Sequence, residues 1–340
     1  MRTTFPNSTE NVTAVVVTYN RKELLSECIN ALRNQTRKID QILVINNGST
    51  DGTESWLKQQ QDLQYFSQNN SGSGGGFSTG IKMAYEQKCT WIWLMDDDGF
   101  PKEDALEKLL AGNPEPLMLH NCAVISKEDK KTFVWKTKHY KTIDDVDKKI
   151  IMDVSHPFNG TLLHRKIVEK VGLPKPGLFI WGDETEYRFR IIGKNKIPYC
   201  TVSDSIHYHP PTKDSYRTDW DFTTNWKMYY LLRNRFAILR SRFYQSTVLS
   251  TFMYLGFIFL FAGTVLVFQR TNKIKKLGFI LWPVRDALNG NYKATPTFVL
   301  QKLSVSSGYN FGNYFQQQIK ILKTFISQRA SPTSHELKKA

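Results

Sequence analysis

The chain has 340 residues, which is long for one domain and comfortable for two, and its composition is that of a globular protein without low-complexity tracts. Its net charge of +15 is placed unevenly. Residues 1–225 hold 29 basic and 29 acidic side chains, whereas residues 226–340 hold 17 basic and two acidic ones. This distribution argues against a uniformly basic protein, and no nucleic-acid motif is present. We therefore expect two regions, 1–225 and 226–340, and no nucleic-acid partner, with a non-enzymatic nucleic-acid-binding protein as the remote alternative.

The four cysteines form no Cys-x-x-Cys pair and no cluster with the ligand spacing of a zinc site. They are Cys28, Cys89, Cys122 and Cys200. We therefore expect reduced thiols. The chain is polar up to Val12, which predicts that there is no signal peptide and that the catalytic region faces the cytoplasm.

Strands and helices alternate in the first part of the chain. Ala14–Val17 is a short buried strand, and Leu24–Leu32 places apolar residues at helical spacing. A second buried strand, Gln41–Ile45, precedes a helix that contains Trp56 and Leu57. This β-α-β-α order predicts a parallel sheet with right-handed crossovers.

A glycine-rich loop, 69–77, leads into a predicted helix around Ile81–Tyr85. Its backbone N–H groups could hold an anion, and a flexible surface loop is the alternative. A dinucleotide site would need Gly-x-Gly-x-x-Gly directly after the first strand, where residues 18–21 have no glycine. The sequence therefore argues against NAD binding.

Three carboxylates, Asp96, Asp97 and Asp98, follow the very apolar strand Trp91–Met95. Such a strand is typical of a sheet covered on both faces, and open α/β sheets bind ligands beyond the carboxyl ends of their strands. Adjacent acids repel each other, so burying them together requires a cation or a donor. Asp96 and Asp98 would share one side of an extended chain, and oxygen ligands suit Mg²⁺ or Mn²⁺. A solvated acidic turn is the alternative.

We expect mixed strands between residues 117 and 160, a helix over Arg165–Val171 and then a second acidic segment. In this segment Asp183 and Glu184 follow Trp181 closely. A carboxylate beside another acid and a tryptophan ring has a raised pKa, which suits proton abstraction. One acid could face a cleft while the other pairs with Arg188 or Arg190. The alternative is a helix start, where the macrodipole favours acids.

Two histidines stand where the N-terminal region closes, around Ser205–Pro210. A neutral imidazole from His207 or His209 could complete a metal site begun by acids. The alternative for an isolated histidine is a structural role, and the sequence alone does not separate the two residues.

The segment 243–269 carries no charged side chain and is long enough to cross a membrane. Arginines precede it and basic residues follow it. Positive charge marks the cytoplasmic side, and here both flanks qualify. We therefore predict a re-entrant or in-plane helix on anionic lipid, with the core helix of a soluble domain as the alternative.

The order of these motifs resembles that of the inverting family 2 glycosyltransferases, which have the GT-A fold. The matching segments are 15–21, 47–53, 72–77, 93–98 and 181–184. The resemblance covers about residues 12–210 and implies a Rossmann-like mixed α/β sheet, mostly parallel, with flanking helices. The basic, mostly helical C-terminal region would be membrane-associated. Within the family, Leu-Met-Asp-Asp-Asp and Trp-Gly-Asp-Glu are most similar to bacterial galactofuranosyltransferases, with rhamnosyltransferases as close relatives.

The resemblance implies a role for each matching residue. The residues expected at the nucleotide-sugar donor are Thr18, Tyr19 and Arg21 around the nucleotide, Asn46 or Asn47 at the uracil or ribose, Asn70, Gly74, Gly75 and Gly76 along the pocket, and Asp97 beside the sugar. The expected ligands of Mn²⁺ or Mg²⁺ are Asp96, Asp98 and His209. His209 matches the metal-binding histidine of the family better than His207 does. Trp181 would stack on the acceptor sugar. Glu184 falls at the position of the catalytic base, with Asp183 as its neighbour.

Two residues depart from the family pattern. Asn46 stands where the second strand usually ends in an acid, which weakens the uridine assignment. Glu184 replaces the more common aspartate, which leaves open whether Asp183 is the base. The implied activity is transfer of galactofuranose from UDP-galactofuranose to a lipid-linked glycan of O-antigen or capsule. The implied location is the cytoplasmic face of the bacterial inner membrane. A rhamnosyltransferase or another hexosyltransferase is the alternative, and a nucleotidyltransferase would need a basic glycine-rich signature that is not seen.

Overall fold

The structure is a computed structural model. It describes residues 10–135, 137, 139–152, 158–211, 220, 226–244 and 246–306. The chain divides into two compact units, which we describe separately. The first contains Met1–Lys213 and Ile238–Thr247, and the second contains Asp214–Ala237 and Val248–Ala340. The division at residue 225 that the charge distribution suggests stays a prediction.

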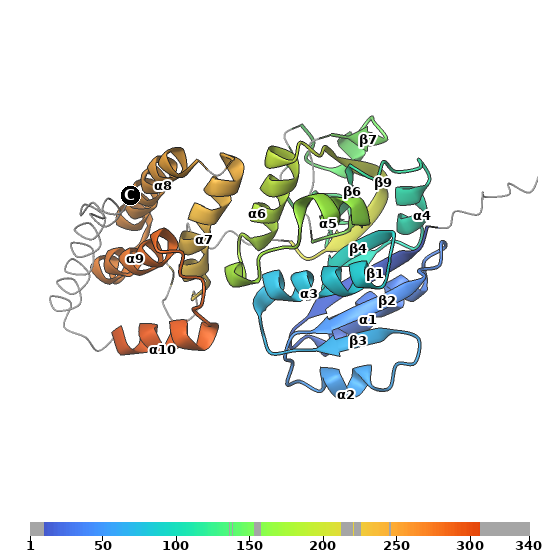
Figure 1. The fold of residues 1–340 in the computed structure, drawn as a ribbon, viewed down its shortest axis with the longest axis horizontal. Coiled ribbons are helices and arrows are strands. Elements are labelled where there is room, and N and C mark those ends of the chain that lie inside the picture. The colour runs from blue at the N-terminus through green and yellow to red at the C-terminus, as the bar shows by residue number, and fades with distance from the viewer. Residues whose placement is uncertain are drawn as a thin grey trace, which may run out of the picture. The chain divides into compact units, whose positions relative to one another are not determined.

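The first unit is built on a nine-stranded mixed sheet among the described residues (Figure 1). Its strands are β1 (Val12–Thr18), β2 (Gln41–Asn46), β3 (Gln64–Ser67), β4 (Trp91–Asp96), β5 (Phe100–Pro101), β6 (Leu119–Ser126), β7 (Ile150–Ile151), β8 (Thr161–His164) and β9 (Tyr199–His209). They run in the order β3-β2-β1-β4-β8-β6-β9-β5, and β7 pairs with β9. The first four are mutually parallel, whereas β8, β5 and β7 are antiparallel to their neighbours. This confirms the mixed, mostly parallel α/β fold.

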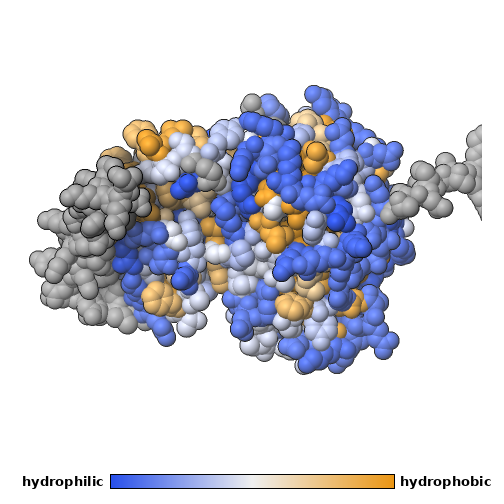
Figure 2. All heavy atoms as spheres, viewed as in Figure 1, coloured by the Kyte–Doolittle hydropathy of each residue, from blue (hydrophilic) through white to orange (hydrophobic). Residues whose placement is uncertain are grey.

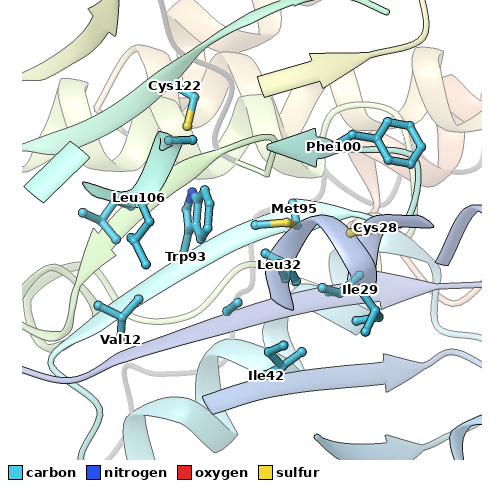
Figure 3. Close-up of a cluster of buried hydrophobic side chains, with 14 of the residues drawn as sticks. Val12, Cys28, Ile29, Leu32, Ile42, Trp93, Met95, Phe100, Leu106 and Cys122 are labelled. Carbon is cyan, nitrogen blue, oxygen red and sulfur yellow. The ribbon is translucent and has the colours of Figure 1, made fainter. Parts of the chain in front are cut away.

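Helices cover both faces of this sheet. They are α1 (Lys22–Arg33), α2 (Thr53–Leu57), α3 (Gly72–Glu86), α4 (Ala105–Leu110), α5 (Arg165–Val171) and α6 (Asp183–Phe189), with short turns η1 (Ile143–Asp145), η2 (Pro176–Leu178) and η3 (Arg190–Lys194). Alternate residues of the central strands enter two separate cores, because side chains alternate across a strand. One core joins Trp93 and Met95 to α1 and α4 (Figure 3), and the other joins Val15 and Leu94 to α3, α5 and α6.

The glycine-rich segment differs from the prediction of a loop, because α3 already begins at Gly72. Its glycines are buried and allow the helix to lie close to the sheet. A Cβ on Gly76 would lie 2.4 Å from Val17 Cγ1, and one on Gly80 would lie 2.4 Å from Val15 Cγ1. Close packing against β1 therefore explains these glycines, as a Gly-rich sequence otherwise weakens a helix.

The second unit contains the helical region expected at the C-terminus. Its helices are α8 (Thr247–Phe268), α9 (Lys273–Leu288), α10 (Pro296–Ser306) and the greater part of α7 (Lys227–Arg242). Tyr254 of α8 packs against α7, where its hydroxyl donates to Leu232 O at 3.0 Å and its ring lies 5.3 Å from that of Phe236. α8 matches the predicted apolar segment and, among the described residues, is the one helix long and apolar enough to cross a membrane.

Candidate active site

Polar residues gather where three parallel strands of the first unit end together. The register of β1 pairs Thr18 with Asn46 of β2 and Val17 with Asp96 of β4. The carboxyl ends of these strands therefore lie at one edge of the sheet, where open α/β sheets bind ligands. The acid triplet begins at this edge.

Asp97 is the buried centre of the triplet and is held from two sides. Thr18 Oγ1 donates to its Oδ2 at 2.8 Å, and Arg21 Nη1 donates to its Oδ1 at 3.1 Å. Arg21 Nη1 also lies 2.7 Å from Asp98 Oδ2. Burial raises the pKa of Asp97 to about 6, although the charge of Arg21 and the hydrogen bond from Thr18 lower it. In this structure, Thr18 and Arg21 thus organise the acids.

Asp96, Asp98 and His209 form a group with the chemistry of a divalent-cation site, since one potential ligand atom from each lies within 4.8 Å of the others. His209 Nδ1 lies 2.7 Å from Pro210 O, which can only accept, so Nδ1 carries a hydrogen. The other nitrogen, Nε2, faces Asp98 Oδ1 at 3.3 Å. Two acceptors that face each other require a proton or a metal ion between them, so these residues fit a cation.

Burial and mutual repulsion shift the pKa values of this group in different directions. Burial, and then the charges of Asp98 and Asp97, raise the pKa of Asp96 to about 8. Burial lowers the pKa of His209, but its hydrogen bond and charge interaction with Asp98 outweigh burial and raise it. The pKa of Asp98 is lowered because His209 and Arg21 outweigh its own burial.

His207 has a different environment from His209. It is fully buried, and neither ring nitrogen has a hydrogen-bond partner among the described residues. Burial lowers the pKa of His207 to about 3. A Cβ on Gly99 would lie 2.4 Å from its Nε2, so the ring packs under the turn that follows the acid triplet. The structure thus groups His209 with the two acids and gives His207 a packing position.

The asparagines expected at the donor brace the same edge internally. Asn46 is buried, and its side chain bonds Ser67 Oγ at 3.1 Å and Ser49 N at 3.1 Å. Asn47 is also buried and donates to Gly72 O at 2.9 Å. Their contact with a nucleotide stays a prediction. Tyr19 and Asn70, by contrast, are exposed at this edge, and Asn70 Oδ1 accepts from Gly72 N.

The predicted donor-pocket glycines lie inside α3. Gly74, Gly75 and Gly76 are all buried. A Cβ on Gly74 would lie 3.1 Å from Asp183 Cβ, and one on Gly75 would lie 2.2 Å from Ser71 Oγ. These contacts give the three glycines a packing role at the start of α3, and their contact with the donor stays a prediction.

The second acidic segment begins with a strained turn. Phe179 and Trp181 have φ angles of 66° and 58°, a region that bulky L-residues rarely adopt. Each such residue costs of order 1–3 kcal/mol and is commonly retained at functional sites. Gly74 N donates to Phe179 O at 3.1 Å and so ties the turn to α3. Trp181 is half-buried, and its contact with an acceptor sugar stays a prediction.

The two candidate bases leave this turn in different environments. Asp183 has no exposed surface, and its Oδ2 lies within hydrogen-bond distance of Ser73 Oγ, at 2.7 Å. Burial, and then the charge of Glu184, raise the pKa of Asp183 well above its usual range. Glu184 is half-buried and can reach solvent. Of the two arginines expected as possible partners of these acids, Arg188 and Arg190, Arg190 instead binds Glu186 at 3.0 Å.

A series of hydrogen bonds connects the two acidic segments along one edge of the sheet. Asp97 accepts from Thr18 Oγ1, and Thr18 O accepts from Asn47 N at 2.9 Å. Asn47 then binds Gly72 O, and the next residue, Ser73, binds Asp183. The triplet and the segment around Glu184 therefore stand at the same end of the first unit, on either side of the start of α3.

Sequence reasoning missed two residues that hold this arrangement. Ser73 lies inside a glycine-rich run, where only the tertiary contact with Asp183 reveals its position. Glu186 is fully buried and binds Lys175 Nζ at 2.7 Å, Arg190 Nε at 3.0 Å and Ser241 Oγ at 2.7 Å. Its i,i+4 spacing to Arg190 is the one signal in the sequence.

Known proteins with similar sequences are glycosyltransferases. Residues 13–172 match the family model described as Glycosyl transferase family 2. The galactofuranosyltransferase GlfT1 of Mycobacterium tuberculosis H37Rv is 30% identical over 223 residues, which cover 62% of this chain and 73% of that protein. The GlfT1 of Mycolicibacterium smegmatis is 30% identical over 224 residues, covering 62% and 74%.

Solved structures with a similar fold include residues 1–349 of S. aureus TarS, which have 13% sequence identity and a TM-score of 0.53 and cover 92% of each chain. The same protein in complex with UDP has 12% identity and a TM-score of 0.53, covering 97% of this chain and 94% of that one. Together with the order of motifs and the mixed sheet, the sequence matches show that this chain belongs to the family 2 glycosyltransferases.

Proposed function

We propose that this enzyme transfers galactofuranose from UDP-galactofuranose to a lipid-linked glycan during synthesis of a surface polysaccharide such as O-antigen or capsule. The observation that carries the proposal is the gathering of Asp96, Asp98 and His209 at the sheet edge that also bears the Glu184 segment. The named galactofuranosyltransferases among the relatives support the sugar, and the UDP complex of TarS supports a uridine nucleotide. Rhamnose or another hexose from a different nucleotide sugar is the competing donor.

Asp96, Asp98 and His209 would hold a divalent cation, Mn²⁺ or Mg²⁺, for which their oxygen and imidazole atoms are suitable ligands. A cation bound there would neutralise negative charge that develops on the leaving diphosphate. Arg21, which already contacts Asp97 and Asp98, adds a second positive charge at this edge. Tyr19 and Asn70 are exposed beside it and are the side chains we assign to the nucleotide.

Glu184 is the residue to which we assign the catalytic base. Its partial exposure lets it meet the hydroxyl of an incoming acceptor, whereas Asp183 is sealed from solvent. Glu184 takes the hydroxyl proton while the hydroxyl oxygen attacks the anomeric carbon and the bond to the diphosphate breaks. A single displacement of this kind inverts the anomeric configuration. Trp181, at the start of the same segment, offers an aromatic face for the acceptor sugar.

A donor screen with product mass as readout tests the proposed sugar. The purified full chain is incubated with a synthetic lipid-diphosphate acceptor and Mn²⁺ or Mg²⁺. Separate reactions contain equal concentrations of UDP-galactofuranose, UDP-galactopyranose or dTDP-rhamnose. We expect a product heavier by one hexose with UDP-galactofuranose alone. Transfer from another donor with none from UDP-galactofuranose would show that the sugar is wrong.

Two substitutions test the assigned roles. Glu184→Gln is expected to lower turnover by about 10²–10⁴, the usual effect of removing a general base. Asp98→Asn is expected to abolish both transfer and Mn²⁺ binding, the latter measured by electron paramagnetic resonance. Glu128→Gln and Asp144→Asn change exposed residues of the first unit and serve as matched controls. Wild-type activity in either test variant contradicts its role.

The apolar helix α8 suits an enzyme whose acceptor is anchored in lipid. One face of the helix, which carries Tyr254, is buried within the second unit, while Phe252 and Phe259 are 73% and 79% exposed. Figure 2 shows hydrophobic spheres gathered over α8. Insertion across the bilayer would carry the adjoining α7, with Arg235 stacked on Phe257, toward hydrocarbon at a high cost. An in-plane helix on the cytoplasmic face of the inner membrane avoids this cost and leaves the basic flanks on anionic lipid.

Vesicle flotation tests this membrane contact. The wild-type protein is expected to float with vesicles that contain anionic lipid and to float less with neutral vesicles. The double variant Phe252→Asp/Phe259→Asp should stay with the soluble fraction while it keeps its turnover on a water-soluble acceptor. Phe66→Asp, which changes an exposed phenylalanine of β3, is the control. Flotation of the double variant at the wild-type level would refute the assignment of α8.

A further inference from the structure

The Ser73 hydroxyl lies between two acceptor groups in the first unit. Its Oγ is 2.7 Å from Asp183 Oδ2 and 3.3 Å from the carbonyl oxygen of Phe179. A serine hydroxyl has one hydrogen to donate and two lone pairs to accept with. The carbonyl of Phe179 can only accept, and so can an ionised carboxylate.

Counting hydrogens decides between the two protonation states of Asp183. If Asp183 is ionised, the single hydrogen of Ser73 can satisfy either the carboxylate or Phe179 O, and the other contact becomes two acceptors facing each other. If Asp183 carries a proton, Asp183 donates to Ser73 Oγ, and Ser73 donates to Phe179 O. Only the protonated form makes both contacts favourable.

The surroundings of Asp183 offer no compensation for a negative charge. The residue is fully buried, and its Oδ1 accepts from no donor among the described residues; the side-chain contact with the Glu184 carboxyl raises the pKa of Asp183 further and does not offset a charge. The first turn of α3, which packs against it, carries no charged side chain, while the adjoining Glu184 on α6 is an acid. The nearby cations Lys175 and Arg190 are bound to Glu186 instead. An isolated buried carboxylate is costly, and such groups stay neutral in proteins.

We propose that Asp183 is a neutral carboxylic acid in the native enzyme and acts as a positioning residue. It donates to Ser73 and so fastens the strained Phe179–Trp181 turn to α3. Glu184 is then the ionised member of the pair. The inference rests on the proposed role of Glu184 as base, which it deepens. Burial and the neighbouring charge of Glu184 raise the pKa of Asp183 in the same direction.

The substitution Asp183→Asn separates this role from that of a base. An asparagine amide can donate to Ser73 as the neutral acid does and stays uncharged at every pH. We expect turnover and acceptor KM within about threefold of wild type, against a loss of at least about 100-fold for Glu184→Gln. Loss of turnover in Asp183→Asn equal to that in Glu184→Gln would overturn the proposal and make Asp183 the base.

The pH dependence of stability supplies a second readout. A folded-state pKa above the unfolded value means that the stabilising proton is present at low pH and lost as the pH rises through the folded pKa. The melting temperature of the wild type should therefore fall as the pH rises from about 4, the ordinary pKa of an unfolded aspartate, toward the folded pKa, and that of Asp183→Asn should fall less over the same range. The exposed Asp144→Asn should follow the wild type. An identical decline in all three proteins contradicts the proposal.

Infrared difference spectroscopy tests the protonation state without any substrate. The spectrum of wild type minus Asp183→Asn at pH 7 should contain the C=O band of a protonated carboxyl group, and a carboxylate pair of bands would overturn the assignment. If Asp183→Asn does not fold, Ser73→Ala shifts the same band by removing its hydrogen-bond partner, and no shift counts against the proposal. A protein that shows the protonated band but transfers no sugar refutes the proposed function and leaves this assignment intact.

Discussion

The close approach of α3 to β1 makes Gly76→Ala a strong test of how the first unit is packed. A Cβ at this position would lie 2.4 Å from Val17 Cγ1 and 3.3 Å from Val17 Cγ2, whereas ordinary contacts begin near 3.4 Å. Overpacking of this kind costs about 1–3 kcal/mol. The better helix propensity of alanine returns up to about 1 kcal/mol. We therefore expect a net loss of about 1–2 kcal/mol in the free energy of unfolding.

A double substitution isolates the clash from other effects. Val17→Ala removes both γ carbons and leaves Val17 Cβ at 3.5 Å from the new methyl group, which is an ordinary contact. Gly76→Ala should therefore cost little in a Val17→Ala background, and the coupling between the two sites should equal the overpacking cost of about 1–3 kcal/mol, because the helix propensity of alanine is the same in both backgrounds. Gly112→Ala is the control, because nothing lies within 4 Å of a Cβ there.

Urea denaturation of the wild type and the four variants, followed by circular dichroism, measures these differences. Two results would refute the reasoning. One is a Gly76→Ala protein as stable as Gly112→Ala, and the other is a double variant whose loss equals the sum of the single losses. Either would mean that α3 can move away from β1 at little cost.

Three further predictions concern the same unit. Gly72→Ala should lose both stability and transfer, because its Cβ would lie 2.0 Å from Phe179 O. The control Gly52→Ala has a similar positive φ but nothing within 4 Å of its Cβ, so it should lose only stability, and equal transfer by the two variants would contradict this prediction. Glu186→Ala should cost about 1–3 kcal/mol in urea denaturation, because it leaves the partly buried Arg190 and the buried Ser241 hydroxyl without this acceptor, and a loss under about 0.5 kcal/mol would refute the role of the Glu186 ion pairs. The thiols of Cys28 and Cys122 are buried, and burial raises the pKa of Cys122 to about 12. A thiol reagent should therefore label these two cysteines only after unfolding, and fast labelling of the native protein would contradict their buried positions.

Much of the first unit was predictable from local patterns. The buried strands around Val15, Leu43 and Trp93 were recognisable as apolar runs before polar turns, and α1 and α5 from helical spacing. The acid triplet was recognisable because it follows one of these strands. The carboxyl end of that strand lies at the edge of the parallel sheet where open α/β folds bind ligands. These features depend on periodicity and chain order, which a sequence displays directly.

Other features depend on contacts between residues far apart in the chain. His207 and His209 are indistinguishable in sequence, and only the neighbours of each ring, Gly99 for one and Asp98 for the other, separate them. The glycine run at the start of α3 predicts a loop from sequence alone, because the reason for these glycines is the side chains of β1 that face them in the fold.

The amino-acid sequence by itself determined the family, the sheet and the two acidic segments, since hydrophobic periodicity and motif order are properties of the chain alone. The tertiary structure decided which acid is sealed and which can reach solvent. That distinction between Asp183 and Glu184 comes from burial and from the hydroxyl of Ser73, 110 residues away along the chain. Neighbours in sequence can differ in chemistry because the folded environment, and not the residue type, sets the cost of carrying a charge.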